Sequence, residues 1–174
     1  MGIQFETDYN METLTAMAKS LRKTVRKKRS RRVHIFAAVV LILGLLTILA
    51  TTAGGEPLGA SGVVTLLAML VVILVSLFED KLNAWFARKR LLPGTEHAAA
   101  TFEEDGYVSA TGVTESRFSY AQIVAVAETA RYFVFALSSH HTQAYDKRTI
   151  RGGSVEDFRA FIAEKTGKLI ANIK

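Results

Sequence analysis

Two long apolar runs dominate the hydropathy pattern of the chain. Residues 33–53 read VHIFAAVVLILGLLTILATTA, and residues 63–78 read VVTLLAMLVVILVSLF. About 20 apolar residues span the hydrocarbon core of a bilayer as a helix, and the second run reaches that length when it is counted from Leu58. A soluble domain of this size could hardly cover two helices that are apolar on every side. The pattern predicts a transmembrane hairpin with spans over residues 33–53 and 58–78.

The segments beside the two spans have periods of their own. Residues 3–7 alternate between apolar and polar, which predicts an edge strand. An apolar stripe of helical spacing predicts a helix over residues 10–32 that leads into the first span; its members are Met11, Leu14, Ala18, Leu21 and Val25. Residues 79–92 continue the second span as a helix until Pro93-Gly94 ends it. We expect residues 1–9 to be a strand that joins the soluble domain, and residues 10–94 to be the hairpin with its cytoplasmic helical extensions.

After Pro93 the period changes to that of strands. The strands predicted for this region cover residues 96–103, 107–112, 115–127, 131–138 and 142–150. Asp105-Gly106 is a tight-turn sequence, and both faces of residues 131–137 are apolar, which indicates a central strand. Ser154 and Asp157 resemble a capping box, and an apolar stripe then predicts a C-terminal helix over residues 154–172. Residues 95–174 are therefore expected to form a strongly curved antiparallel sheet plugged by that helix.

Charge gives the hairpin an orientation. Residues 1–32 carry nine Lys or Arg and three acids, the turn GGEPLGASG carries no base, and four bases follow the second span. Under the positive-inside rule the turn lies outside and both chain ends lie in the cytoplasm. The positive excess sits beside the spans and residues 95–174 are nearly neutral, which argues against a nucleic-acid partner. The apolar run at residues 33–53 and the 32 residues before it are both too long for a cleavable signal peptide.

The basic residues at the cytoplasmic ends allow two compatible interpretations. They set the topology, or they also contact anionic lipid headgroups, where each base adds on the order of 1 kcal/mol. The candidates for lipid contact are Arg22, Lys23, Arg26, Lys27, Lys28, Arg29, Arg31, Arg32, Arg88, Lys89 and Arg90. Trp85 and Phe86 lie among them. They suit the headgroup level of the membrane, and packing against the soluble domain is an equal alternative.

Several motifs resemble those of the YcxB-like family of small bacterial membrane proteins. They are the acidic-aromatic start at residues 5–9, the two-helix hairpin, Phe102 to Gly106, Tyr120 to Val124, Glu128 to Phe133, and Lys147-Arg148 before the last helix. The chain has Asp146 where the family has a proline before the Lys-Arg pair, and it lacks a tryptophan near Tyr120. The resemblance implies a pleckstrin-homology-like barrel for the soluble part and a bacterial plasma membrane location. It implies no activity.

No catalytic or metal-binding constellation stands out in the sequence. The chain has no cysteine, which excludes disulfides and thiolate chemistry. His140-His141 lies in a predicted turn, and a metal site there would need His97 or Asp146 as a further ligand. Residues 151–154 at a helix start could bind an anion through backbone amides, but simple capping accounts for them better. We therefore expect no catalytic residue, no metal and no cofactor.

Three functional hypotheses follow. The leading one is a non-enzymatic, membrane-anchored binding or scaffold module with anionic lipid and a protein as partners. The second is an immunity-type protein that protects against a toxin or bacteriocin, and the third is a membrane-associated enzyme. Gly44 and the small residues at 59–62 would permit close helix packing, so a homo-oligomer stays open. The fold class expected overall is an α+β membrane protein: a two-helix transmembrane hairpin plus a cytoplasmic, antiparallel β-barrel-like domain with a C-terminal helix.

Overall fold

The structure is a computed structural model that describes residues 2–55 and 57–174. Glu56, the single acidic residue expected in the turn of the hairpin, therefore lies outside the described residues. The chain divides into two compact units, one made of residues 1–27 and 83–174 and the other of residues 28–82. We call the first the β unit and the second the hairpin unit, and we describe each by itself.

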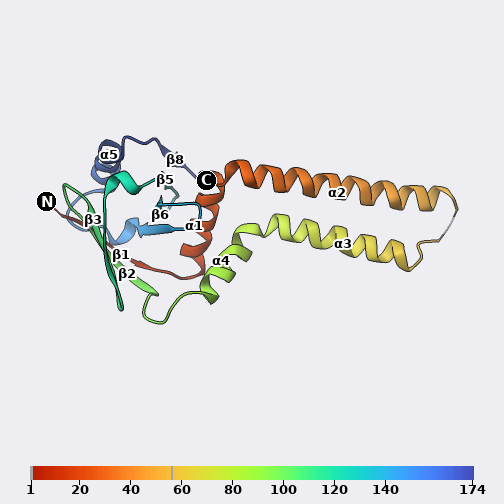
Figure 1. Cartoon of the computed structure of the whole chain (residues 1–174), viewed down its shortest axis with the longest axis horizontal. Coiled ribbons are helices and arrows are strands. Elements are labelled where there is room, and N and C mark those ends of the chain that lie inside the picture. The colour runs from red at the N-terminus through yellow and green to blue at the C-terminus, as the bar shows by residue number, and fades with distance from the viewer. Residues whose placement is uncertain (1, 56) are drawn as a thin grey trace. The chain divides into compact units, whose positions relative to one another are not determined.

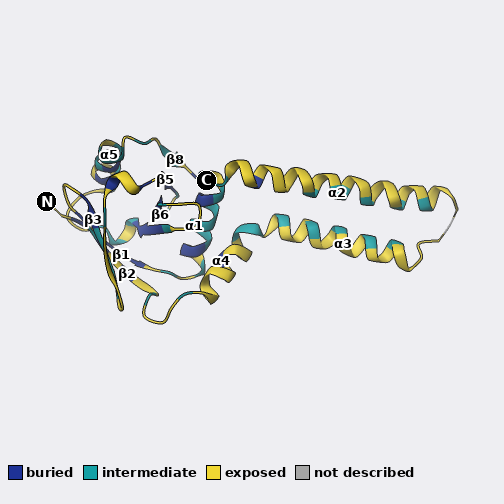
Figure 2. Ribbon diagram, in the orientation of Figure 1, coloured by how far each residue is buried: buried dark blue, intermediate teal, exposed yellow. Residues whose placement is uncertain are grey.

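The hairpin unit consists of two long apolar helices. Helix α2 covers Lys27–Ala53 and α3 covers Ala60–Leu77, and they lie side by side in Figure 1. The helices meet at Gly44, where an added Cβ would lie only 2.8 Å from Sδ of Met69. No residue in the most apolar stretch of either helix is buried. Both helices are long and apolar enough to cross a membrane. Figure 2 shows most residues of both helices as exposed, with intermediate ones at intervals along them.

Two breaks separate these helices from their extensions. The helix expected over residues 10–32 is instead two helices, because α1 (Met11–Lys23) ends at Thr24, whose dihedrals are not helical, before α2 begins. Helix α3 likewise ends at Phe78, and α4 covers only Glu79–Lys89. The N-terminus of α1 is capped by the side chain of Asn10, which accepts hydrogen bonds from the amides of Glu12 and Thr13.

Eight strands of the β unit form two four-stranded sheets. The first has the order β1-β2-β3-β4 and the second the order β7-β6-β5-β8. The strands of the first sheet are β1 (Ile3–Asp8), β2 (His97–Phe102), β3 (Tyr107–Thr111) and β4 (Glu115–Phe118). Those of the second are β5 (Ala125–Glu128), β6 (Tyr132–Ala136), β7 (Thr142–Asp146) and β8 (Ile170–Asn172). The expected mixed α+β content is confirmed, but the sheets do not close into a barrel.

The gaps between the sheets have local causes. Between β1 and the end of β7, the backbones are joined only by an isolated bridge of Gln4 with Arg151. Side chains add further contacts there; the amide of Asp146, for example, donates to Thr7 Oγ1. At the other gap, the single strand expected over residues 115–127 is interrupted after β4. Ser119 caps a 3₁₀ turn, η1 (Tyr120–Gln122), and Gln122 accepts from the Ser119 amide in return. A second 3₁₀ turn, η2 (Lys147–Thr149), shortens the strand expected over residues 142–150.

The C-terminal helix is shorter than its apolar stripe predicts. Helix α5 covers Val155–Thr166 and begins with the expected capping box of Ser154 and Asp157. It ends at Gly167, which has a φ of 62° in the left-handed region that favours glycine. The chain then forms β8, which runs parallel to β5 and not antiparallel as the other strands do. The helix expected over residues 154–172 is therefore wrong after residue 166.

Aromatic side chains fill the space between the two sheets. Phe158 of α5 is fully buried, and its ring centroid lies 4.6 Å from that of Phe5 and 4.8 Å from that of Phe102. All five residues of β6 are buried, as its apolar faces indicate for a central strand. One face of β6 joins the aromatic core, and the other meets a smaller cluster in which Met17 of α1 packs. Both faces of the second sheet are thereby covered.

Replacing Phe158 tests the central place of this core. Phe158→Ala should lower the free energy of unfolding of the β unit by about 3–5 kcal/mol, because it leaves a cavity among several rings. Leu169→Ala is the matched control; Leu169 is 96% exposed, so its change should be within about 0.5 kcal/mol. Denaturant unfolding of the full chain in detergent, followed by near-ultraviolet circular dichroism, measures both. Equal losses for the two variants would contradict this core.

Candidate functional site

The basic residues expected to contact lipid belong to three segments. Arg22 and Lys23 lie in the last turn of α1, and Arg26 lies in the break after it. The basic residues of the first turns of α2 are all exposed: Lys27, Lys28, Arg29, Arg31 and Arg32. Arg88, Lys89 and Arg90 are exposed at the end of α4. Arg26 is also engaged within the β unit, because its Nε donates to the carbonyl of Ser139 at 2.6 Å.

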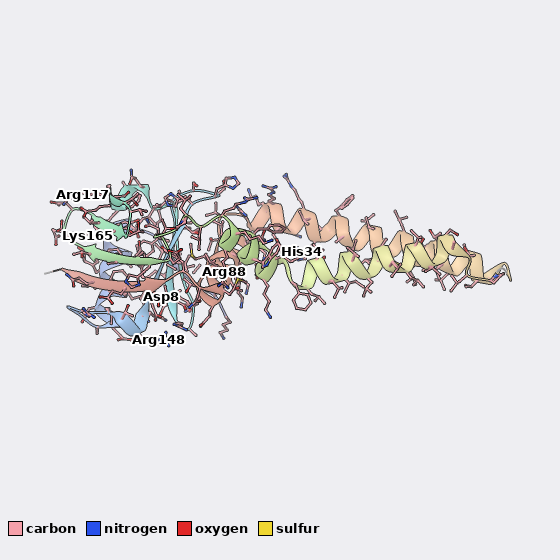
Figure 3. All side chains as sticks on the ribbon, turned by 90° about the horizontal axis from the view of Figure 1, so that it is seen from below. Asp8, His34, Arg88, Arg117, Arg148 and Lys165 are labelled. Carbon is pink, nitrogen blue, oxygen red and sulfur yellow. The ribbon has the colours of Figure 1, made fainter. Side chains whose placement is uncertain are left out.

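The histidines have separate surroundings. His97 Nδ1 lies 2.8 Å from Asp8 Oδ1, and His140 Nδ1 lies 3.0 Å from Nη2 of Arg26. In the hairpin unit His34 lies 3.7 Å from Glu79, at the base of the α2–α3 pair (Figure 3). Among residues 2–55 and 57–174, no three His, Asp or Glu side chains gather as metal ligands would. The metal site considered for His140-His141 therefore finds no third ligand in that part of the chain.

Two buried acids hold the β unit together. Glu128 of β5 accepts from Lys147 of η2 at 2.9 Å and from Arg159 of α5 at 2.8 Å. Asp146 accepts from Arg131 and from Arg148, both at 2.9 Å. Each acid has a side chain only 7% exposed. Because their oxygens accept from cations of neighbouring elements, these carboxylates link several elements of the fold.

A cleft lies near the ends of both sheets, on the side of α1. We call it the β3–β7 cleft; its volume is about 280 Å³. Its lining residues are Tyr9, Leu14, Met17, Leu91, Thr95, Ser109, Thr111, Thr114, Ser116, Phe118, His141, Thr142 and Gln143. The lining thus combines hydroxyl groups with apolar side chains, and His141 is its one basic residue. This chemistry suits a neutral ligand better than a phosphate or a metal ion.

Gln143 gives the cleft one oriented polar group. Its Oε1 accepts hydrogen bonds from the hydroxyls of Tyr107 and Tyr145, each at 2.8 Å. Burial raises the pKa of both tyrosines, so their hydroxyls stay protonated donors. Gln143 is only 7% exposed and lines the cleft.

A second hollow of about 440 Å³ lies beside the cleft and shares Tyr9 and Leu91 with it. It is lined further by Asp8, Asn10, Arg88, Glu96 and His97. Figure 3 labels Asp8 and Arg88. Both signs of charge are present here, and His97 is already paired with Asp8. The hollow therefore lacks the single dominant charge that would select an ionic ligand.

Sequence reasoning did not find the cleft or the buried acids. The cleft collects residues from α1, β3, β4 and β7, which are far apart along the chain. The sequence does indicate that Glu128 is unusual, because this acid ends the apolar run Ala125–Ala127 just before the strand predicted to be central. A charge at such a position needs a buried partner. The partners, Lys147 and Arg159, are identified only by the tertiary structure.

The Glu128 cluster predicts acid sensitivity. The hydrogen bond from Arg159, with that from Lys147, lowers the pKa of Glu128 from 4.5 to about 2 despite its burial. A carboxyl whose pKa is depressed on folding stabilises the protein above its unfolded pKa, and this contribution is lost as pH falls through the folded value. The free energy of unfolding should therefore decline between pH 4.5 and about pH 2.

The variant Glu128→Gln isolates this contribution. It should cost about 3–5 kcal/mol at neutral pH, because two cations lose their partner, and it should remove part of the acid decline. The control is Glu115→Gln, which changes an exposed acid of β4 and should leave the pH profile unchanged. Unfolding of the full chain in detergent at several pH values is the measurement. An unaltered acid decline in Glu128→Gln would contradict the assignment.

Comparison with known proteins bears on the same region. Residues 102–162 match the model of a protein family described as YcxB-like protein. That range runs from the end of β2 into α5 and contains β3, β4 and the Gln143 strand. No curated protein and no solved structure matches the chain. The resemblance read from the motifs is thus confirmed over residues 102–162, where the chain is similar to the YcxB-like family.

Proposed function

We propose that this protein is a membrane-anchored binding module of the bacterial plasma membrane. Helices α2 and α3 cross the bilayer, both chain ends lie in the cytoplasm, and the β3–β7 cleft receives a neutral group of a partner. The proposal describes a binding protein and not an enzyme. The β unit would resemble a pleckstrin-homology-like domain, with α5 closing the space between its sheets.

The pairing of β1 with β2 is the observation that carries the topology. β1 precedes the hairpin and β2 follows it, and they pair from Ile3 opposite Phe102 to Asp8 opposite His97. Two paired strands lie in one compartment, so a segment between them that enters a membrane has to cross it an even number of times. Two apolar helices satisfy that condition. The excess of Lys and Arg before α2 and after α3 then favours the cytoplasm for the β unit.

The energetics favour insertion over exposure to water. Residues 33–53 contain twelve Val, Ile, Leu or Phe side chains. Each favours the centre of a membrane helix by about 0.3–0.6 kcal/mol, so the first helix alone gains roughly 4–7 kcal/mol. α3 adds a similar surface, and the described parts of both spans contain no Asp, Glu, Lys or Arg between residues 33 and 78. A bilayer is therefore the medium that accepts this surface.

The cleft supports the second half of the proposal. Its hydroxyl groups and Gln143 offer hydrogen bonds, and Leu14, Met17 and Leu91 offer apolar contacts. The described lining holds no buried carboxylate and no metal-ligand cluster. Such a surface recognises a group and holds it, with no charge placed to drive a reaction. The volume of about 280 Å³ suits one bulky side chain or a small ligand.

Topology is tested with single cysteines, because the chain has none of its own. Gly59→Cys lies in the turn, where an added Cβ meets nothing within 4 Å, and Leu169→Cys lies on the exposed surface of the β unit. In intact cells a membrane-impermeant maleimide should label residue 59 and not residue 169. Residue 169 should react only after the membrane is permeabilised. Labelling of both residues, or of residue 169 alone, in intact cells contradicts the topology.

The cleft is tested by filling it. Ser116→Trp places an indole in the cleft, whereas Glu115→Trp places one on the opposite face of the same strand. Full-length protein is purified from its native membrane, and the bound proteins and lipids are identified. A partner that is lost from Ser116→Trp and kept by Glu115→Trp supports the binding site. If both variants melt like the wild type and keep every partner, the cleft is not the binding site.

A further inference from the structure

Helix α4 has one buried and one exposed face. Ala84 is its buried residue. The opposite side carries Leu82, Trp85 and Phe86, which are 38%, 44% and 50% exposed, and Phe78 just before the helix is 46% exposed. Positions 78, 82, 85 and 89 follow helical spacing, so Phe78, Leu82, Trp85 and Lys89 form one stripe, with Phe86 beside it. Trp85 therefore keeps a large part of its surface exposed.

Cations accompany these aromatic rings. Nζ of Lys89 lies 3.7 Å from the centroid of the Trp85 ring, and Nζ of Lys81 lies 5.7 Å from that of Phe78. Trp85 and Phe86 meet edge to face, with centroids 5.0 Å apart. Arg88 and Arg90 are exposed nearby. Tryptophan, phenylalanine and lysine on one helix are the combination found where a helix lies in the membrane interface.

The distance from α3 restricts where this face can lie. Trp85 is eight residues beyond Leu77, the last residue of α3. A helix that continued straight out would place it about 12 Å beyond that end, at 1.5 Å per residue. The headgroup layer on each side is only roughly 5–8 Å thick. If α4 continued straight on from α3, Trp85 would lie in water. If α4 turns along the membrane surface, Trp85 stays at the interface. The break at Phe78, where α3 ends before α4 begins, allows such a turn.

We propose that α4 is an interfacial helix that lies along the cytoplasmic surface of the bilayer. Trp85 and Phe86 sit at the boundary between headgroups and acyl chains, and Arg88, Lys89 and Arg90 contact anionic headgroups. This inference rests on the proposed function, because it requires α3 to span the membrane. It assigns the exposed stripe of α4 to lipid, where each basic residue adds about 1 kcal/mol. The hydrophobic and charged contributions act on the same surface, as they do in other surface-bound helices.

Trp85 provides the test, because it is the one tryptophan of the chain. The full-length protein is reconstituted in vesicles of phosphatidylcholine and phosphatidylglycerol that contain lipids brominated at different depths. Bromine near the carbonyl end of the acyl chain should quench most of the Trp85 emission, and bromine near the methyl end should quench less. Iodide in the buffer should have little effect. An emission quenched by iodide and untouched by every bromolipid would overturn the inference.

A second tryptophan separates this inference from the proposed function. In the background Trp85→Phe, the substitution Leu70→Trp places the only indole within α3, at an exposed position. Its emission should be quenched best by bromine near the methyl end. If that holds while Trp85 responds to iodide alone, the hairpin stands and the interfacial helix is wrong. If neither tryptophan is quenched by bromolipid, α3 is not in the bilayer and the proposed function fails with it.

Discussion

The apolar surface of α2 and α3 is the constraint on which the rest of the structure depends. The two helices meet each other at Gly44 and Met69, but most of their large apolar side chains are exposed. Burying that surface within the chain would need a second core, and the β unit has already filled its own with Phe5, Phe102 and Phe158. The two units therefore have different surfaces, and the breaks at residues 24–26 and 78 separate α2 and α3 from α1 and α4 along the chain.

The hairpin is inserted between two strands that pair with each other. β1 and β2 pair across an insertion of nearly ninety residues. The ion pairs of Glu128 and Asp146 join elements of the β unit that come later in the chain. Closing so long a loop costs little more than closing a moderate one, because the entropic cost grows with the logarithm of loop length. The two apolar helices of the insertion lie side by side, so the hairpin itself brings the two ends of the loop back together.

The elements that follow from local chemistry could be predicted from the sequence. The apolar runs predict α2 and α3, alternation predicts β1, and Ser154 with Asp157 predicts the start of α5. What could not be predicted depends on single backbone positions or on distant partners. Gly167 ends α5 although the apolar stripe continues, and Ser119 turns the chain within a run of strand formers. The cleft collects residues from distant elements, and Gln143 accepts from Tyr107 of another strand, which no local pattern encodes.

Burial of α2 and α3 in lipid is the central claim, and a spin-label accessibility scan tests it most directly. Labels are attached to single cysteines along both helices of the reconstituted protein, and collisions with oxygen and with a water-soluble nickel complex are measured. Oxygen accessibility should rise toward the middle of each helix, near Leu46 and Leu70, and nickel accessibility should rise only at the ends. Nickel accessibility along one whole face of either helix would show that this face meets water and would contradict the account.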